Sequence, residues 1–218
     1  MSSLRSSALA GLTSTQVGSL QSTQVAALTA QQAGGLTGEQ TVNLSSNQAK
    51  SLAVGVLSGM TTAALSSMNT TALSSLTATQ LAGLSATQVG ALTTAQLASL
   101  TTTQAASLSA AQTAGLGSDL VQGLEAADIG KLSVAAVASL TTTAVQVLSS
   151  DQLAGLSSTQ MGALTAAQVG ALTTTQLGTL GTAQSVGLKA AQLAAISTTK
   201  VSTLNTDAFA TLAATALT

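Results

Sequence analysis

The side chains that could do chemistry in this 218-residue sequence are mainly hydroxyls and carboxamides, because His and Cys are absent. Their absence removes the usual general base, the common nitrogen ligand of metals and an activated thiol. The many Ser and Thr hydroxyls have no adjacent group that would turn one of them into a nucleophile. The sequence also lacks a phosphate-binding loop of the GxxxxGK[ST] type. We therefore expect neither enzyme activity nor a cofactor.

One group of charged residues comes closest to a metal site. It consists of Asp119, Glu125, Asp128 and Lys131. Calcium needs several carboxylates that converge on one point, and the spacing here matches neither an EF-hand loop nor a Gly/Asp nonapeptide. We predict a solvated surface for these residues and no metal site.

The chemistry that the hydroxyls and carboxamides can perform is hydrogen bonding to the backbone. Ser or Thr is followed three residues later by Gln at 13 equivalent places, for example Ser85 with Gln88 and Thr165 with Gln168. This spacing defines a capping box, in which the hydroxyl accepts from the N–H three residues on and the Gln accepts from the N–H of the cap. We predict that each such pair begins a helix.

These pairs recur because the whole sequence repeats every eight residues. From Leu4 onward, 24 of 27 positions spaced by eight are Leu, and the other three are Met60, Met68 and Ile196. The consensus is L-[ST]-x-x-Q-[LV]-[GA]-x, and no insertion or deletion breaks it. We call each repeat an octad and number its positions as slots one to eight, starting at the Leu. Residues 1–218 are thus expected to form one octapeptide-repeat solenoid.

Slots one and six define the expected core. They precede the cap and lie four residues into the helix, which is the arrangement of a hydrophobic staple. Slots seven and eight contain 15 of the 19 glycines, where a chain leaving a helix often needs a positive φ and where small residues let coils approach closely. The predicted core is represented by Leu12, Val17, Leu84, Val89, Leu164 and Val169.

The spacing favours very short helices over the two regular alternatives. A continuous helix turns by about 100° per residue, so the Leu positions would spiral around it. In a strand, slots one and six would face opposite sides, although a β-solenoid with corners remains an alternative that explains the Thr content. Helices shorter than about 12 residues are marginal alone, so the octads must stack. We predict an all-α superhelical solenoid and leave open the number of octads per turn.

Slot five divides the solenoid into blocks. Gln fills this slot from Gln16 to Gln48, from Gln80 to Gln112 and from Gln152 to Gln192, and Ala, Val, Leu or Asp interrupts the series. The pattern suggests sub-blocks at 1–75, 76–147 and 148–218. Neutral variation at a tolerant slot explains the same interruptions.

The composition excludes several kinds of partner. Charged residues make up 5% of the chain, the net charge is −1, and Phe209 is the single aromatic residue, so we expect no nucleic-acid binding. No run of 18 apolar residues occurs, which excludes a transmembrane segment. A hydrophobic content of 45% and a mean hydropathy of +0.49 oppose disorder.

The ends of the repeat suggest a function, because neither carries the polar cap that a monomeric solenoid needs. The candidate contacts between subunits are Leu4 and Leu9 at one end and Phe209, Leu212 and Leu217 at the other. Head-to-tail contacts propagate into open filaments. We predict a structural subunit that assembles with itself into an extracellular filament or surface fibre. The alternative is an adhesin-like module that binds glycan, mineral or ice through Ser/Thr arrays.

The octads resemble the repeats of large proteobacterial secreted or surface proteins, which are loosely labelled adhesion or haem-utilisation proteins. The resemblance is carried by repeats such as 92–99 (LTTAQLAS) and 172–179 (LTTTQLGT). It implies export to the cell exterior by a type I-like route without the usual cleaved signal peptide, with cell-surface or matrix components as further partners. A cytoplasmic location stays open as the alternative. A haem role has no support, since His and Tyr are absent.

Overall fold

The computed structural model describes residues 5–204, 206, 208 and 210, and within them every regular element is a helix. These residues form 25 α-helices of four to six residues and no strand. The predicted all-α solenoid is therefore confirmed for this part of the chain, and the β-solenoid alternative is wrong there.

The chain divides into two compact units, Met1–Ser107 and Leu108–Thr218, and the division falls inside the expected sub-block 76–147. Unit 1 contains α1 (Ser6–Ala10), α2 (Ser14–Gly18), α3 (Ser22–Ala26), α4 (Ala30–Ala33), α5 (Gly38–Thr41), α6 (Ser46–Ser51), α7 (Val54–Gly59), α8 (Thr62–Ser66), α9 (Thr70–Ser74), α10 (Ala78–Ala82), α11 (Ala86–Val89), α12 (Thr94–Ala98) and α13 (Thr102–Ala106). Unit 2 contains α14 (Ala110–Ala114), α15 (Ser118–Val121), α16 (Ala126–Lys131), α17 (Val134–Ala138), α18 (Thr142–Gln146), α19 (Ser150–Ala154), α20 (Ser158–Met161), α21 (Ala166–Ala171), α22 (Thr174–Gly178), α23 (Thr182–Val186), α24 (Ala190–Ala194) and α25 (Thr198–Val201).

Each helix begins at slot three, because the slot-two residue is an N-cap with an extended backbone. Ser85 precedes α11 with φ −70° and ψ 159°, and its hydroxyl accepts from the N–H of Gln88 at 3.1 Å. The Oε1 of Gln88 accepts from the N–H of Ser85 at 2.9 Å. Thr165 and Gln168 form the same capping box before α21. The helices are short because slot one returns to an extended backbone, as at Leu52 after α6.

The core of each unit consists of the side chains at slots one and six. Val89 and Val169 in slot six have 0% exposure, and Leu84 and Leu164 in slot one have 3%. At the N-terminal end, Val17 is buried and Leu12 is half-buried. An octad therefore covers its apolar residues fully only where other octads pack against it.

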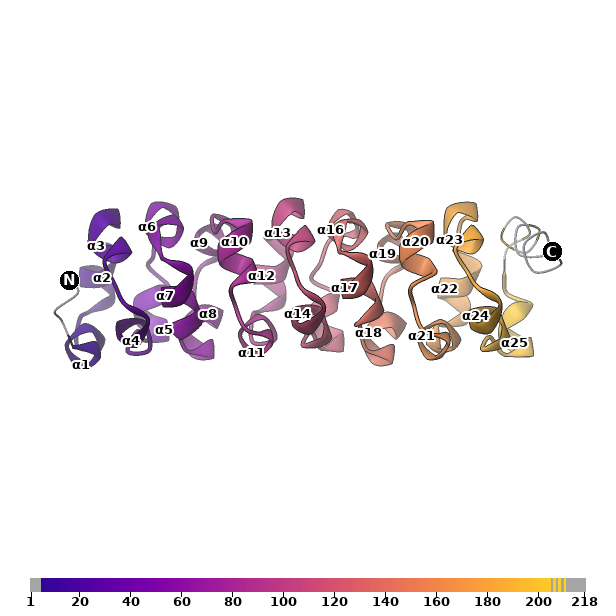
Figure 1. The fold of residues 1–218 in the computed structure, drawn as a ribbon, viewed down its shortest axis with the longest axis horizontal. Helices are drawn as coiled ribbons and strands as arrows, with labels where there is room; N and C mark the ends of the chain where they lie inside the picture. Colours follow the sequence, from indigo (N-terminus) through magenta and orange to yellow (C-terminus); the bar gives the residue numbers. More distant parts are fainter. Residues whose placement is uncertain (1–4, 205, 207, 209, 211–218) are drawn as a thin grey trace. The chain divides into compact units, whose positions relative to one another are not determined.

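Successive octads wind into coils, and a coil takes more than three octads but fewer than four. The helices that pack together in each unit are separated by two others, as in α1 with α4, α2 with α5 and α14 with α17 (Figure 1). Hydrogen bonds from side chains to the backbone of a neighbouring coil join residues 25 to 29 positions apart. The Ser46 hydroxyl reaches the carbonyl of Thr71 at 3.5 Å, and the Ser75 hydroxyl donates to the carbonyl of Ser46 at 3.1 Å. The structure thus gives the number of octads per turn, which the sequence left open.

The glycines of slots seven and eight allow coils to touch through their backbones. No glycine among the described residues has a positive φ, so the expected left-handed helix ends are wrong. Gly155, for example, ends α19 in the right-handed region, at φ −68° and ψ −20°. A Cβ on Gly155 would collide with the carbonyl oxygen of Ala126, and one on Gly130 would lie 2.6 Å from the carbonyl oxygen of Gly155. Close approach is the reason for these glycines.

This contact predicts opposite effects for two Gly→Ala substitutions. Gly155→Ala should lower the free energy of unfolding by roughly 1–3 kcal/mol, because the methyl group forces the coils apart. Gly55→Ala should raise it by about 0.5–1 kcal/mol, because Gly55 lies in α7 with nothing within 4 Å of the new Cβ. Urea unfolding followed by circular dichroism measures both, and equal effects would contradict the close-approach explanation.

Candidate functional site

The most regular polar feature of the structure is a series of buried slot-five glutamines that we call the glutamine ladder. In each of them, the Nε2 group donates to backbone carbonyls 28 to 31 residues earlier in the chain. Its members are Gln40, Gln48, Gln80, Gln88, Gln96, Gln104, Gln152, Gln160, Gln168, Gln176, Gln184 and Gln192.

Gln96 shows how one carboxamide serves two purposes. Its Oε1 accepts from the N–H of Thr93 at 2.8 Å, which caps the start of α12. Its Nε2 donates to the carbonyl oxygens of Leu65 at 2.9 Å and Met68 at 2.8 Å in the preceding coil. The side chain is 2% exposed. The same group therefore begins a helix and fastens that helix to the previous coil.

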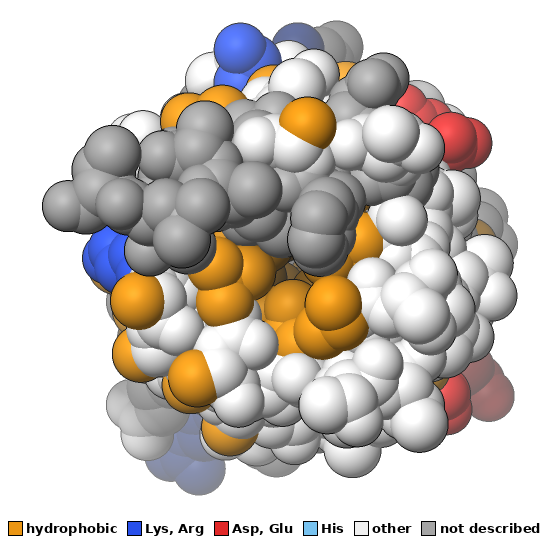
Figure 2. All heavy atoms as spheres, turned by 90° about the vertical axis from the view of Figure 1, so that its right-hand side faces the viewer, with side chains coloured by type: hydrophobic (Ala, Val, Ile, Leu, Met, Phe, Trp, Pro, Cys, Tyr) orange, Lys and Arg blue, Asp and Glu red, His pale blue; other side chains and the backbone are white. Residues whose placement is uncertain are grey.

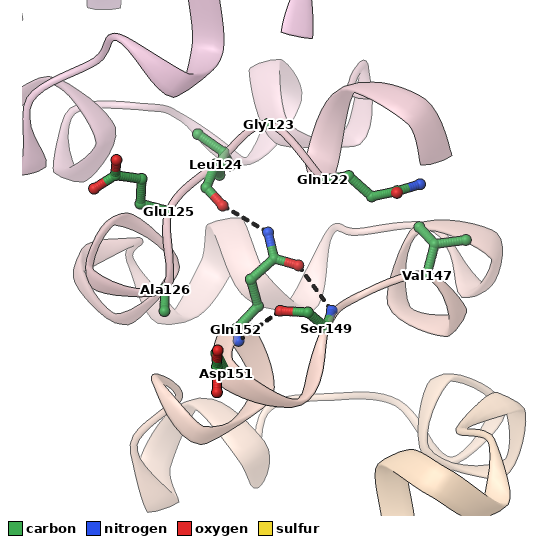
Figure 3. Close-up of a pocket in the computed structure, with 9 residues that line it drawn as sticks. All are labelled: Gln122, Gly123, Leu124, Glu125, Ala126, Val147, Ser149, Asp151 and Gln152. Atoms are coloured by element: carbon green, nitrogen blue, oxygen red, sulfur yellow. Dashed lines mark hydrogen bonds between the residues drawn. The ribbon is translucent and has the colours of Figure 1, made fainter. Parts of the chain in front are cut away.

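Figure 3 shows this arrangement in unit 2, at an open depression lined by residues that include Gln122, Glu125 and Asp151. Gln152 points its Oε1 at the N–H of Ser149, 2.9 Å away, and its Nε2 at the carbonyl oxygen of Leu124, 2.6 Å away. Two carboxylates line the depression, but within the described ranges no three His, Cys, Asp or Glu side chains come together as metal ligands do. The depression is thus a gap between coils that the ladder crosses.

Other side chains donate across the coils at two octads that lack the glutamine. Asn69 donates its Nδ2 to the carbonyls of Val42 and Leu44, both at 2.9 Å, and Ala72 occupies slot five of that octad. Lys200 occupies slot five itself and donates its Nζ to the carbonyl of Gly170 at 2.8 Å. Gln, Asn and Lys side chains therefore all supply a donor to the preceding coil, as the hydroxyl of Ser75 also does.

The sequence predicted the capping bond of those glutamines that follow a Ser or Thr by three residues, and it missed the bond between coils. The available signal was the choice of Gln itself. Glu serves equally well in a capping box, yet no octad has Glu in slot five. A carboxamide combines the acceptor that the cap needs with a donor for the preceding coil, whereas an ionised carboxylate has no donor.

The predicted contacts between subunits lie mostly beyond the described residues. Leu4, Phe209, Leu212 and Leu217 fall outside them. Leu9 lies inside, in α1, and its side chain is completely buried in unit 1. Leu9 therefore has no exposed surface with which it could contact another subunit.

Asp128 is buried, which corrects the expected solvated surface at this residue. It occupies slot five in α16 and is 1% exposed, because most slot-five side chains of the interior octads lie between coils. The N–H of Glu125 donates to its carboxylate, while the second oxygen, Oδ2, has no hydrogen-bond partner. Burial raises the pKa of Asp128, and the nearby charge of Glu125 adds to this effect. A carboxylate lacks the donor that a slot-five glutamine has.

Fold and ladder together define a repeat-based structural or binding module built as an all-α solenoid. Residues 121–158 match the sequence profile of the ALTTAQ repeat. The six letters of that name also occur at residues 91–96. A search of curated proteins finds no significant match to this chain. Among the helices that the structure describes, none is long and apolar enough to cross a membrane.

The ladder predicts that interior glutamines contribute far more to stability than exposed ones. Gln96→Ala should lower the free energy of unfolding by about 2–4 kcal/mol, because it removes the capping bond and leaves buried carbonyls of the preceding coil without their donor. Gln31→Ala, at an exposed slot-four position, should change it by less than about 0.5 kcal/mol. Chemical denaturation of both variants measures the difference, and similar losses would contradict a special role for slot five.

Asp128 predicts that part of the stability is lost as the pH rises. Because burial raises the folded-state pKa above the unfolded value of about 3.9, folding favours the protonated carboxyl. The stabilisation should be complete below the unfolded pKa and disappear as the pH passes the raised folded pKa. Asp128→Asn should remove this dependence and stabilise the protein at pH 7 by roughly 1–3 kcal/mol.

Thermal unfolding between pH 3 and pH 7 measures this effect for the parent chain and the variant. Asp119→Asn is the control, because the Asp119 side chain is exposed. A pH profile that Asp128→Asn leaves unchanged would show that the buried carboxyl has no part in it.

Proposed function

We propose that this protein is a non-catalytic structural subunit whose copies add head to tail to form a filament outside the cell or at its surface. The observation that carries the proposal concerns slot six in the last described octads. Leu193 and Val201 are half-buried there, whereas the interior slot-six residues Leu97 and Leu177 have 0% exposure. The surface on which each coil receives the next one is thus only partly covered at this end.

The end of unit 2 has the composition expected for such a contact. Figure 2 looks at it from the side of its C-terminal helices and shows hydrophobic side chains gathered near the centre, with uncharged polar groups and backbone around them. Charged groups lie toward the rim. A further coil placed on this face would bury apolar side chains such as Leu193 and Val201, which favours association.

The chemistry of the chain supports open-ended growth. The two ends of a solenoid are different surfaces, so a contact between them is heterologous and propagates instead of closing. With 5% charged residues and a net charge of −1, copies repel one another little. The location outside the cell, the type I-like export and the contact with cell-surface or matrix components are proposed from the resemblance of the octads to repeats of surface proteins.

A second candidate function is binding to a periodic surface such as glycan, mineral or ice. It is favoured by exposed hydroxyls at slots three and four, which the caps do not use, as at Thr102 and Thr103 in α13 and at Thr174 and Thr175 in α22. Glycan-array binding and thermal hysteresis measurements test it. They separate it from the filament, because assembly needs neither ligand.

The filament proposal predicts concentration-dependent growth of the purified 218-residue chain. Negative-stain electron microscopy should show linear particles whose length rises with protein concentration. Sedimentation velocity should show a matching increase in mass that persists in high salt, since the contact is mainly apolar and uncharged. Monodisperse particles at every concentration and salt level would overturn the proposal.

A further inference from the structure

The first two slot-five glutamines are bound to their caps like members of the glutamine ladder, but their Nε2 groups have no acceptor within the described residues. The Oε1 of Gln16 accepts from the N–H of Thr13 at 2.8 Å, and that of Gln24 accepts from the N–H of Gln21 at 2.9 Å. Both side chains are exposed. Their Nε2 groups donate to no atom of the described chain, whereas the other fourteen slot-five glutamines are buried.

We propose that the Nε2 groups of Gln16 and Gln24 donate to backbone carbonyls on the C-terminal side of a second copy of this chain, such as that of Val201 in its last described coil, so that the glutamine ladder continues across the joint between subunits. The inference rests on the proposed function and names the polar contact that gives the joint its register.

The capping bond prepares each carboxamide for this contact. In the interior, an Oε1 that accepts from the cap N–H leaves the Nε2 directed at the preceding coil, as in Gln40, whose Nε2 lies 2.9 Å from the carbonyl oxygen of Leu9. Gln16 and Gln24 have the same bond to their caps. Little conformational freedom is therefore lost when an acceptor arrives, which favours binding.

Suitable acceptors exist in the last described coil. Inside the ladder, the carbonyl of Leu65 accepts twice, from the N–H of Met68 at 3.1 Å and from the Nε2 of Gln96 at 2.9 Å. The equivalent slot-six carbonyl of Val201 accepts from the N–H of Leu204 at 3.2 Å and from no glutamine within the described chain. A carbonyl oxygen has two lone pairs, so this one retains capacity for a ladder donor.

The apolar residues around donors and acceptors are complementary too. On the first coil, Leu12 and Leu20 in slot one are half-buried, and on the last described coil Leu193 and Val201 in slot six are half-buried. Slots one and six pack together in the interior of each unit. The same pairing between two copies would cover what each end leaves exposed, which identifies another copy of this chain as the occupant.

The decisive variant is Gln16→Glu with Gln24→Glu. Glu keeps the oxygen that accepts from the cap N–H and replaces the Nε2 donor with a second acceptor. At pH 7 we expect the protein concentration at which filaments form to rise by at least about tenfold. Gln31→Ala with Gln146→Ala is the matched control, because both side chains are exposed and lie outside slot five, and it should assemble as the parent chain does.

A second variant separates the loss of a donor from the addition of charge. Gln16→Lys with Gln24→Lys adds charge but keeps a donor, as Lys200 does naturally in slot five. It should assemble within a few-fold of the parent concentration. Circular dichroism tests whether both variants fold.

A mixing experiment adds a readout of direction. The Glu variant retains an intact C-terminal end, so it can accept a parent subunit but cannot bind the next one through its own first coil. A small fraction of it should therefore shorten the filaments of the parent chain.

The outcomes distinguish the two proposals. Failure of the parent chain to assemble at all overturns the filament and this contact with it. Normal assembly of the folded Glu variant overturns the contact alone, and the filament then stands on its apolar surfaces. Loss of assembly in the Lys variant as well as in the Glu variant would also overturn the contact, because it would point to charge.

Discussion

The structure depends on one interaction that recurs along the chain, in which both the Oε1 and the Nε2 of a slot-five glutamine are hydrogen-bonded. A helix of about five residues is far too short to persist alone, because nucleation costs more than so few hydrogen bonds return. The slot-five glutamine overcomes this by capping its own helix with Oε1 and binding the preceding coil with Nε2. Where this glutamine is present, one side chain therefore couples local folding to stacking.

This coupling sets the distance between coils. The side chain of Gln96 is short, so its Nε2 reaches carbonyls 28 to 31 residues earlier only when the two backbones nearly touch. Glycines such as Gly130 and Gly155 make that approach sterically allowed. The leucines of slot one and the residues of slot six then fill the narrow space that remains. The glutamine ladder, the glycines of slots seven and eight and the thin core all go with the same short distance between coils.

The departures from the consensus show which part of the interaction matters. Asn69 and Lys200 differ from Gln in size and charge, yet both donate to a carbonyl of the preceding coil. Asp128 cannot donate while it is ionised, and its Oδ2 lies buried without a partner. The polar side chains that bind the preceding coil thus share a donor directed at it, whereas octads with Val56 or Ala136 in slot five pack without a donor in that slot. The donors of Gln16 and Gln24, which have no acceptor within the described chain, give the proposed filament a defined joint.

The sequence by itself determined the octad, the all-helical class, the capping pairs such as Ser85 with Gln88, and the two apolar slots. These features are local, because a capping box and a staple span only a few residues and their spacing is visible in the chain. Tertiary structure alone decided that a coil takes between three and four octads, that Gln96 reaches Leu65, that Asp128 is buried and that the glycines keep a negative φ. Each of these depends on which octads lie against one another, and that arrangement follows from close packing between coils, which an eight-residue pattern does not encode.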